Sequence, residues 1–177
     1  MTRSSLVLFS RRSNAGLTLI ELLTVIAVIA VLATIAVPNF QQTIKNNQIT
    51  GQHNELVALI TFARSEALRR SGPVSVVVTE SAGESIASVR PGLPTDEGTD
   101  ILRQISLTGV LLTAKPKHFS FNSRGYIRNP DSDEFLNPSS ISITLEHVNC
   151  TSPRQVRALE ILATGQLTID PDAECSS

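Results

Sequence analysis

From Leu17 to Val37 the chain reads LTLIELLTVIAVIAVLATIAV, and Glu21 is the only charged side chain in these 21 residues. A helix rises about 1.5 Å per residue, so about 20 apolar residues cross the roughly 30 Å hydrocarbon core of a bilayer. The run is apolar on every face of such a helix, and a chain of 177 residues could hardly enclose it in a core. The stretch therefore predicts a transmembrane helix over residues 17–37, and a buried core helix is the weaker alternative.

Basic residues flank the apolar run on one side. Arg3, Arg11 and Arg12 precede it, whereas the first basic residue after it is Lys45. The positive-inside rule then predicts a cytoplasmic N-terminus and export of everything after Val37. A cleaved signal peptide is the main rival, because residues 33–36, ATIA, approach a small-residue cleavage pattern. Against it, the apolar run is long for a signal peptide, and such regions seldom hold a carboxylate.

Glu21 needs a partner if the run lies in a membrane. A carboxylate near the centre of a spanning helix costs roughly 2.5–3.5 kcal/mol on insertion scales. Residues 17–37 contain no Lys, Arg or His that could pair with it. Leu17 lies one helical turn before Glu21, on the same face. A cut just before the run would create a cationic amine at Leu17, and such a chain terminus could serve as the partner.

Residues 15–23, AGLTLIELL, closely resemble the class III signal of type IV pilins and type II secretion pseudopilins. The resemblance implies a leader over residues 1–16, which a prepilin peptidase at the cytoplasmic face of the bacterial inner membrane removes between Gly16 and Leu17. It also implies N-methylation of Leu17, and neutralisation by Glu21 of the N-terminal ammonium of a neighbouring subunit during filament assembly. Pro38 falls where pilins carry a helix-kinking proline.

Beyond Pro38 the pattern becomes amphipathic and then changes period. Apolar residues recur at helical spacing as far as Leu68, and Ser71-Gly72-Pro73 ends the pattern, which predicts a helix continuing over residues 38–70. From Val74 the period is two, and we expect strands at residues 74–79, 101–107, 118–122, 141–146, 156–162 and 167–169. No second helix is evident to serve as a parallel crossover. The predicted fold is α+β, with a long N-terminal helix whose second half packs on a mostly antiparallel β-sheet head, residues 71–177.

Cys150 and Cys175 are the only cysteines, and both lie in the part that we expect to be exported. In an oxidising periplasm a disulfide is the default interpretation of such a pair. A metal site is less favoured, because two thiols need further ligands and His53, His118 and His147 show no ligand spacing. We therefore expect a disulfide and neither a metal nor a cofactor.

The head carries a second, scattered resemblance. Ala63-Arg64-Ser65-Glu66-Ala67 leading into Val74, residues 121–125 (FNSRG) and the late Gly165 resemble the GspH/FimT family of minor pilins and pseudopilins. This resemblance implies a structural filament component near the tip, which helps to prime assembly of a type IV pilus or a type II secretion pseudopilus. Its implied partners are the prepilin peptidase and methyltransferase, other major and minor pilins or pseudopilins, and the inner membrane.

No motif in the chain points to catalysis. Residues 83–87, GESIA, approach the nucleophile elbow of hydrolases but lie in a turn-rich stretch without a following helix. Phosphate-binding glycine loops and HExxH pairs do not occur. The acidic residues Asp131, Asp133 and Glu134 are better interpreted as a solvated loop than as a calcium site. We therefore expect a protein that is not an enzyme.

DNA binding is the rival function, because some members of the resembled family act as DNA receptors in natural transformation. Those members share a Gly-Arg-x-Arg motif, whereas here the corresponding stretch is GQLT, residues 165–168. The head also carries thirteen acidic and eight basic side chains, a balance that opposes phosphate affinity. Any DNA contact would have to come from a local patch of the head's arginines, for which the candidates are Arg124, Arg128, Arg154 and Arg157.

Overall fold

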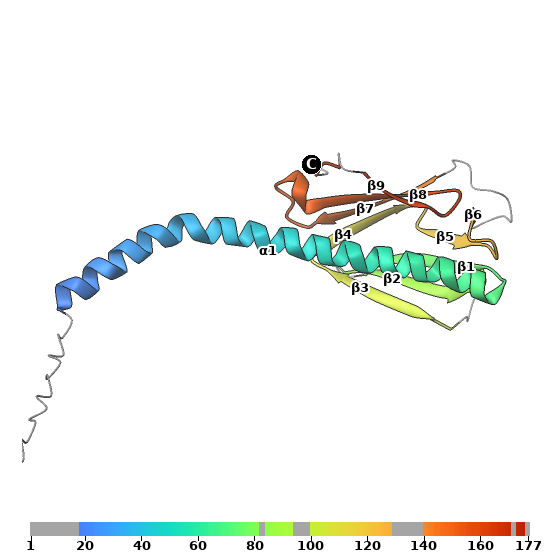
Figure 1. Ribbon diagram of the computed structural model, residues 1–177, viewed down its shortest axis with the longest axis horizontal. Helices are drawn as coiled ribbons and strands as arrows, with labels where there is room; N and C mark the ends of the chain where they lie inside the picture. The colour runs from blue at the N-terminus through green and yellow to red at the C-terminus, as the bar shows by residue number, and fades with distance from the viewer. Residues whose placement is uncertain (1–17, 82–83, 94–99, 129–139, 171–172, 176–177) are drawn as a thin grey trace, which may run out of the picture. The chain divides into compact units, whose positions relative to one another are not determined.

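The computed structural model describes residues 18–81, 84–93, 100–128, 140–170 and 173–175. The chain divides into two units, the first ending at Gln41 and the second running from Gln42 to the C-terminus. One helix, α1, covers Leu19–Arg70 and so contributes to both units (Figure 1). The predicted long N-terminal helix is confirmed.

The described part of the first unit, residues 18–41, is helical from Leu19 and contains no buried residue. Its large apolar side chains, from Leu19 to Val37, are all exposed. By length and composition, α1 is the helix that could cross a membrane among the described residues. A helix with apolar side chains on every face is normally surrounded by lipid or by other protein chains.

The second unit contains two antiparallel sheets (Figure 1). The first has the strand order β3-β2-β1-β5-β6 and the second the order β4-β7-β8-β9, and every pairing is antiparallel. A short 3₁₀ helix, η1, precedes β8. The elements after α1 are β1 (Val74–Ser81), β2 (Glu84–Pro91), β3 (Arg103–Thr108), β4 (Val110–Lys115), β5 (His118–Phe121), β6 (Ile127–Arg128), β7 (Ser140–His147), η1 (Pro153–Gln155), β8 (Val156–Leu162) and β9 (Leu167–Asp170).

The strand predictions were right in six places and incomplete in three. The six expected strands correspond to β1, β3, β5, β7, β8 and β9, whereas β2, β4 and β6 were not predicted. The predicted antiparallel head consists of two sheets. Residues 90–91 are the end of β2, and Pro91 is tolerated there because it is the last residue of the strand.

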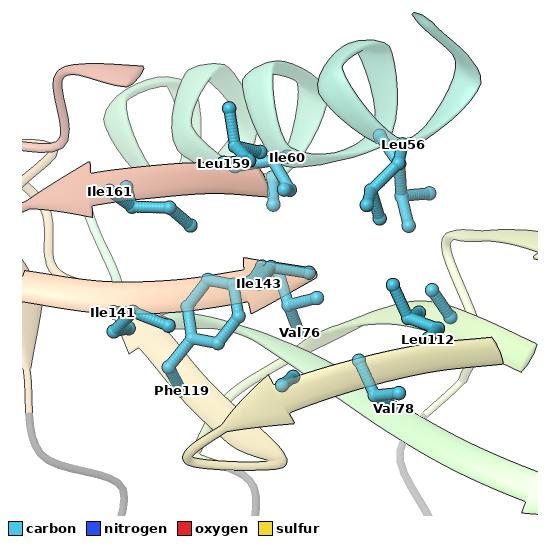
Figure 2. Close-up of a cluster of buried hydrophobic side chains, with 14 of the residues drawn as sticks. Leu56, Ile60, Val76, Val78, Leu112, Phe119, Ile141, Ile143, Leu159 and Ile161 are labelled. Carbon is cyan, nitrogen blue, oxygen red and sulfur yellow. The ribbon is translucent and has the colours of Figure 1, made fainter. Parts of the chain in front are cut away.

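A single apolar core joins α1 to both sheets. Figure 2 shows Leu56 and Ile60 of the helix beside Val76 and Phe119 of the first sheet and Ile143 of the second. All five of these side chains are buried. The ring of Phe119 meets that of Phe121 edge to face, with their centroids 5.8 Å apart. The second half of α1 is therefore held by apolar contact with both sheets.

The helix ends in a Schellman motif. Ser71 has a φ of 53° and donates its N–H to Leu68 O, and the N–H of Gly72 reaches Ala67 O at 3.4 Å. These two bonds satisfy carbonyls that would otherwise be unpaired at the end of the helix. Pro73 follows at once and cannot continue the helix. The predicted stop signal therefore acts where it was expected.

Candidate functional site

The described part of the chain begins one residue after the predicted cleavage site. Gly16 and Leu17 lie outside the described residues, and Thr18 immediately precedes the first residue of α1. The Thr18 hydroxyl accepts a hydrogen bond from the N–H of Glu21 at 3.3 Å, and Thr18 O accepts from Leu22 N at 3.1 Å. Thr18 is thus an N-cap, with Glu21 at the third helical position, the spacing of a capping box.

The Glu21 side chain is exposed among apolar side chains at the N-terminal end of α1. Among the described residues no basic side chain forms an ion pair with it. Its position in the first turn of α1 is electrostatically favourable, because the N-terminus of a helix carries partial positive charge. A cation from outside this part of the chain would complete the charge balance.

Pro38 lies inside α1 and does not end it. A proline ring cannot donate a hydrogen bond to the carbonyl four residues earlier, which here belongs to Thr34. Nearby side chains bond the helix backbone: the Thr34 hydroxyl donates to Val31 O at 2.7 Å, and the Asn39 amide donates to Ile35 O at 3.2 Å. The helix thus continues through the position where the sequence predicted a kink.

Cys150 and Cys175 are joined in a disulfide, with their Cα atoms 5.9 Å apart. The bond links the segment after β7 to the segment after β9. The loop that it closes contains η1, β8 and β9. A carboxylate oxygen of Glu146 and the two sulfur atoms all lie within 4.8 Å of one another. Because a metal binds thiolates, and these sulfur atoms are bonded to each other, this cluster is not a metal centre in the oxidised protein.

The histidines do not form a ligand set in the described residues. His53 lies on α1 and His147 at the end of β7, and both are buried. Burial is the main cause that lowers the pKa of both imidazoles, and the positive charges of Arg157 near His53 and of Lys45 near His147 act in the same direction. A hydrogen bond with Asn54 opposes this effect at His53. Both environments therefore favour the neutral imidazole.

The four candidate arginines fall into two separate pairs. Arg128 lies in β6, and Arg124 precedes this strand. The N–H of Ile127, which lies between them, donates to Ala163 O, just beyond the C-terminal end of β8. Arg154 and Arg157 flank the opposite, N-terminal end of β8. Seven strand residues, at about 3.3 Å each, separate the pairs by roughly 20 Å. The structure therefore does not assemble these arginines into one basic patch.

The Arg157 side chain also forms hydrogen bonds to nearby backbone carbonyls. Its Nη1 donates to Arg154 O at 3.0 Å and to Val156 O at 2.7 Å. A guanidinium that satisfies backbone carbonyls has fewer donors left for a phosphate. Together with the acidic balance of the head, this geometry does not favour DNA binding.

Arg64 brings the scattered residues of the second resemblance together. From α1, its Nε donates to Gly125 O at 3.1 Å and its Nη2 donates to Thr164 O at 3.0 Å. Gly125 and Gly165 both have positive φ, 76° and 75°. A Cβ on Gly165 would lie 2.3 Å from Gly125 O, so the close approach of the two turns requires glycine there. One guanidinium thus ties the helix to the β5–β6 turn and to the β8–β9 turn.

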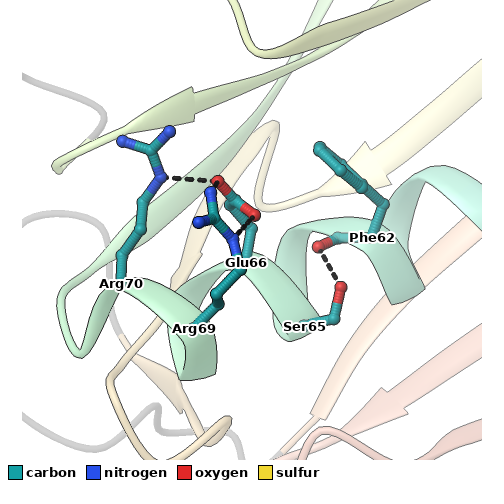
Figure 3. A network of polar contacts seen from close by, with 5 residues as sticks. All are labelled: Phe62, Ser65, Glu66, Arg69 and Arg70. Atoms are coloured by element: carbon teal, nitrogen blue, oxygen red, sulfur yellow. Dashed lines mark hydrogen bonds and ion pairs between the residues drawn. The ribbon is translucent and has the colours of Figure 1, made fainter.

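A second polar cluster closes the C-terminal end of α1 (Figure 3). The buried Glu66 accepts hydrogen bonds from Arg69, at 2.9 Å from Nε and 2.6 Å from Nη2, and from Arg70 Nε at 2.6 Å. Arg69 and Arg70 lie in the last turn of the helix, where a positive charge also interacts favourably with the helix dipole. Sequence reasoning named Glu66 only as part of a resemblance, although its spacing to the two arginines, three and four residues, is the signal of such a pair.

The serine of the near-match to a nucleophile elbow lies in a strand and has a structural contact. Ser85 lies in β2, is buried, and its hydroxyl accepts a hydrogen bond from Leu112 N at 3.3 Å. It therefore links the first sheet to β4 of the second. The acidic cluster at Asp131, Asp133 and Glu134 lies outside the described residues.

Two family models match this chain. The model of type II transport protein GspH matches residues 52–165, and the prokaryotic N-terminal methylation motif matches residues 11–37. The first match covers the part that contains Arg64, Gly125 and Gly165, and the second covers Glu21. No curated protein matches the sequence.

Solved structures share the fold. The type IV minor pilin FimU of Pseudomonas aeruginosa strain PAO1, in one crystal form, matches with a TM-score of 0.54 at 19% identity, covering 71% of this chain and 90% of that one. The minor pseudopilin EpsH from the Type 2 Secretion System of Vibrio cholerae matches with a TM-score of 0.52 at 12% identity, covering 72% and 99%. The likeness to these two structures confirms the predicted type IV pilin-like fold. Because the GspH model matches residues 52–165, more than half of the chain, the chain belongs to the family of type II transport protein GspH.

Proposed function

We propose that the chain is a non-catalytic subunit of a type IV pilus or type II secretion pseudopilus. Before assembly, this subunit resides in the bacterial inner membrane. In this proposal residues 17–37 span the membrane, with the N-terminus in the cytoplasm and the head in the periplasm. Prepilin peptidase removes residues 1–16, and the new amine of Leu17 is methylated. The subunit then enters a filament near its tip and helps to prime assembly.

The observation that carries this proposal is the isolated charge of Glu21. Its carboxylate is exposed on an apolar helix and forms no ion pair within the described residues. A carboxylate among apolar side chains in a membrane costs free energy unless a cation neutralises it. The N-terminal ammonium of a neighbouring subunit would supply that cation when the helices pack in a filament. The match of residues 11–37 to the methylation motif supports processing at the start of the same helix.

Orientation is supported by charge on the two sides of the apolar run. The leader carries three arginines and no acidic residue, and the head is acidic. This asymmetry favours retention of the N-terminus in the cytoplasm. The disulfide between Cys150 and Cys175 is consistent with a head that folds in an oxidising compartment.

Substitution of Glu21 tests the proposal. We expect Glu21→Ala and Glu21→Gln to leave cleavage intact but to reduce incorporation into filaments at least tenfold, because neither side chain can neutralise an ammonium. Quantitative immunoblotting of sheared filaments measures incorporation, and mass spectrometry of the membrane-bound protein measures cleavage. Glu55→Gln is the matched control, since Glu55 is an exposed carboxylate of the same helix outside the apolar run.

Two results would contradict separate parts of the proposal. Normal incorporation of Glu21→Gln would show that charge neutralisation is not its role. Retention of residues 1–16 in the wild-type protein, or normal removal of the leader from a Gly16→Ala variant, would rule out processing between Gly16 and Leu17.

A further inference from the structure

The outer edge of β9 offers unpaired backbone groups. In the described residues β9 is the last strand of its sheet and pairs with β8 alone. The N–H of Leu162 donates to Gln166 O, and hydrogen-bonded pairs alternate along an antiparallel ladder. The groups of Thr168 and Asp170 therefore face β8, whereas the N–H and C=O groups of Leu167 and Ile169 point away from the sheet.

The β9 edge lacks the positive charge that the other edge strands carry. Proteins blunt exposed edge strands with positive charge, proline or short length. The edge strand β3 carries Arg103, β4 ends at Lys115, and β6 contains Arg128. In contrast β9 contains no Lys or Arg, although it is short and Pro171 follows it directly. Its Ile169 is 60% exposed.

An acidic groove runs beside the same edge. It has a volume of about 450 Å³ and crosses β7, β8 and β9. Ser142, Glu160 and Thr168 lie in register across the three strands, and Asp170 is the next residue of β9 on that face. These four polar residues line the groove together with Ala158, Leu159 and Ile169, and none of the described residues that line it is basic. Ile169 pairs with Leu159 on the opposite face of the sheet.

We propose that the edge of β9 binds an extended strand of a neighbouring filament subunit, and that this strand alternates basic and apolar residues. Its backbone would pair with Leu167 and Ile169 and so continue the sheet. Basic side chains would then lie over the groove beside Glu160 and Asp170, and apolar side chains would pack against Ile169, because successive strand residues point to opposite faces. That the partner is a filament subunit rests on the proposed function; its chemistry follows from the edge and the groove.

A peptide probe tests this surface directly. A short peptide of alternating lysine and valine is titrated against the full chain in detergent micelles, and binding is followed by fluorescence anisotropy and by hydrogen exchange. We expect saturable binding that protects the amides of Leu167 and Ile169, whereas a peptide of alternating glutamate and valine should bind at least tenfold more weakly.

Substitutions at the edge make the test specific. Ile169→Pro removes an outward-facing N–H and no bond to β8, so it should weaken binding of the lysine–valine peptide at least tenfold without unfolding the chain. Glu160→Gln should weaken binding severalfold through the lost charge. Leu111→Thr is the control, since Leu111 is an exposed apolar residue of β4, at the other edge of the same sheet.

The outcomes separate this proposal from the proposed function. Binding without protection of Leu167 and Ile169, equal binding of both peptides, or undiminished binding to a folded Ile169→Pro would overturn the docking surface. If edge substitutions behave as expected but Glu21→Gln still enters filaments normally, the surface stands and the assembly role of Glu21 fails. Thermal unfolding of Ile169→Pro checks that the head is intact.

Discussion

Glu66 shows how one buried carboxylate is made acceptable near the end of a helix. Its oxygens accept hydrogen bonds from Arg69 and Arg70, whose side chains remain 69% and 40% exposed. The hydrogen bonds from Arg69 and then Arg70 lower the pKa of Glu66 to about 2, against the opposing effect of burial. The folded state therefore holds the ionised form of Glu66 more strongly than the unfolded chain does.

This pKa shift predicts acid sensitivity. A depressed carboxyl pKa contributes stability above the unfolded value of about 4.3, and that contribution is lost as the pH falls toward 2. We expect Glu66→Gln to lower the thermal midpoint at pH 7 and to flatten its fall between about pH 4.5 and 2. Circular dichroism melts of the full chain in micelles measure both effects. Glu80→Gln, which removes an exposed pair with Lys117 at 3.7 Å, should change neither; parallel curves for wild type and Glu66→Gln would contradict the account.

At the scale of elements, the contact between the β5–β6 and β8–β9 turns depends on glycine. Arg64 fits against both turns only because Gly125 and Gly165 bring no Cβ into the space. At Gly165 a side chain would meet backbone, which cannot move aside as a flexible side chain can. Together with a φ of 75°, this makes Gly165 the turn residue with the least freedom.

Gly165→Ala should therefore destabilise the head by about 2–4 kcal/mol, from the left-handed backbone penalty and the clash with Gly125 O. Urea unfolding of the full chain in micelles measures the change. Gly51→Ala is the control, because a Cβ there meets nothing within 4 Å and alanine favours the helix by about 0.5–1 kcal/mol. Equal stability of Gly165→Ala and the wild type would show that the two turns can separate at little cost.

The same scale explains which elements the sequence could predict. The first six residues of β7 alternate polar and apolar residues, β8 is rich in apolar residues, and the helix stop at Ser71-Gly72-Pro73 is explicit. The strand β2 was missed because its buried positions include Ser85, Ala87 and Ser88, which carry little hydrophobic signal. In β4 the exposed Leu111 hides the alternation, and β6 is defined only by its pairing with β5.

The candidate site was predictable to a different extent at each end of the chain. Residues 15–23 form one contiguous pattern, so Gly16, Leu17 and Glu21 could be named from the sequence alone, although their roles stay predictions. Arg64 of α1 and Gly165 of the head are 101 positions apart, and their contact depends on the tertiary fold. The β9 edge has no sequence motif, because an edge is a property of strand order.

At the scale of the whole molecule, the two units are stabilised in different ways. The described residues of the first unit expose their apolar side chains and depend on their surroundings, whereas the second unit has a core formed by α1 and two sheets. Among the described residues, the second sheet contains the last strands of the chain, and β9 is held by one neighbour only. The disulfide between Cys150 and Cys175 limits the freedom of this part, because it ties the segment after β9 back to the end of β7.

Loss of this disulfide should destabilise the head more than most single substitutions do. A closed loop of this length, with a sequence separation of 25 residues, restricts the unfolded chain by about 3–4 kcal/mol in the loop-entropy account. We expect the double variant Cys150→Ala and Cys175→Ala to lose about that much unfolding free energy in urea titrations of the full chain, and added reductant to lower the stability of the wild type but not of the variant. Hydrogen exchange should increase first in β9, whose single neighbour is β8, while β1 and β2 remain protected. A variant as stable as the oxidised wild type would show that packing of β8 and β9 on the core suffices without the covalent link.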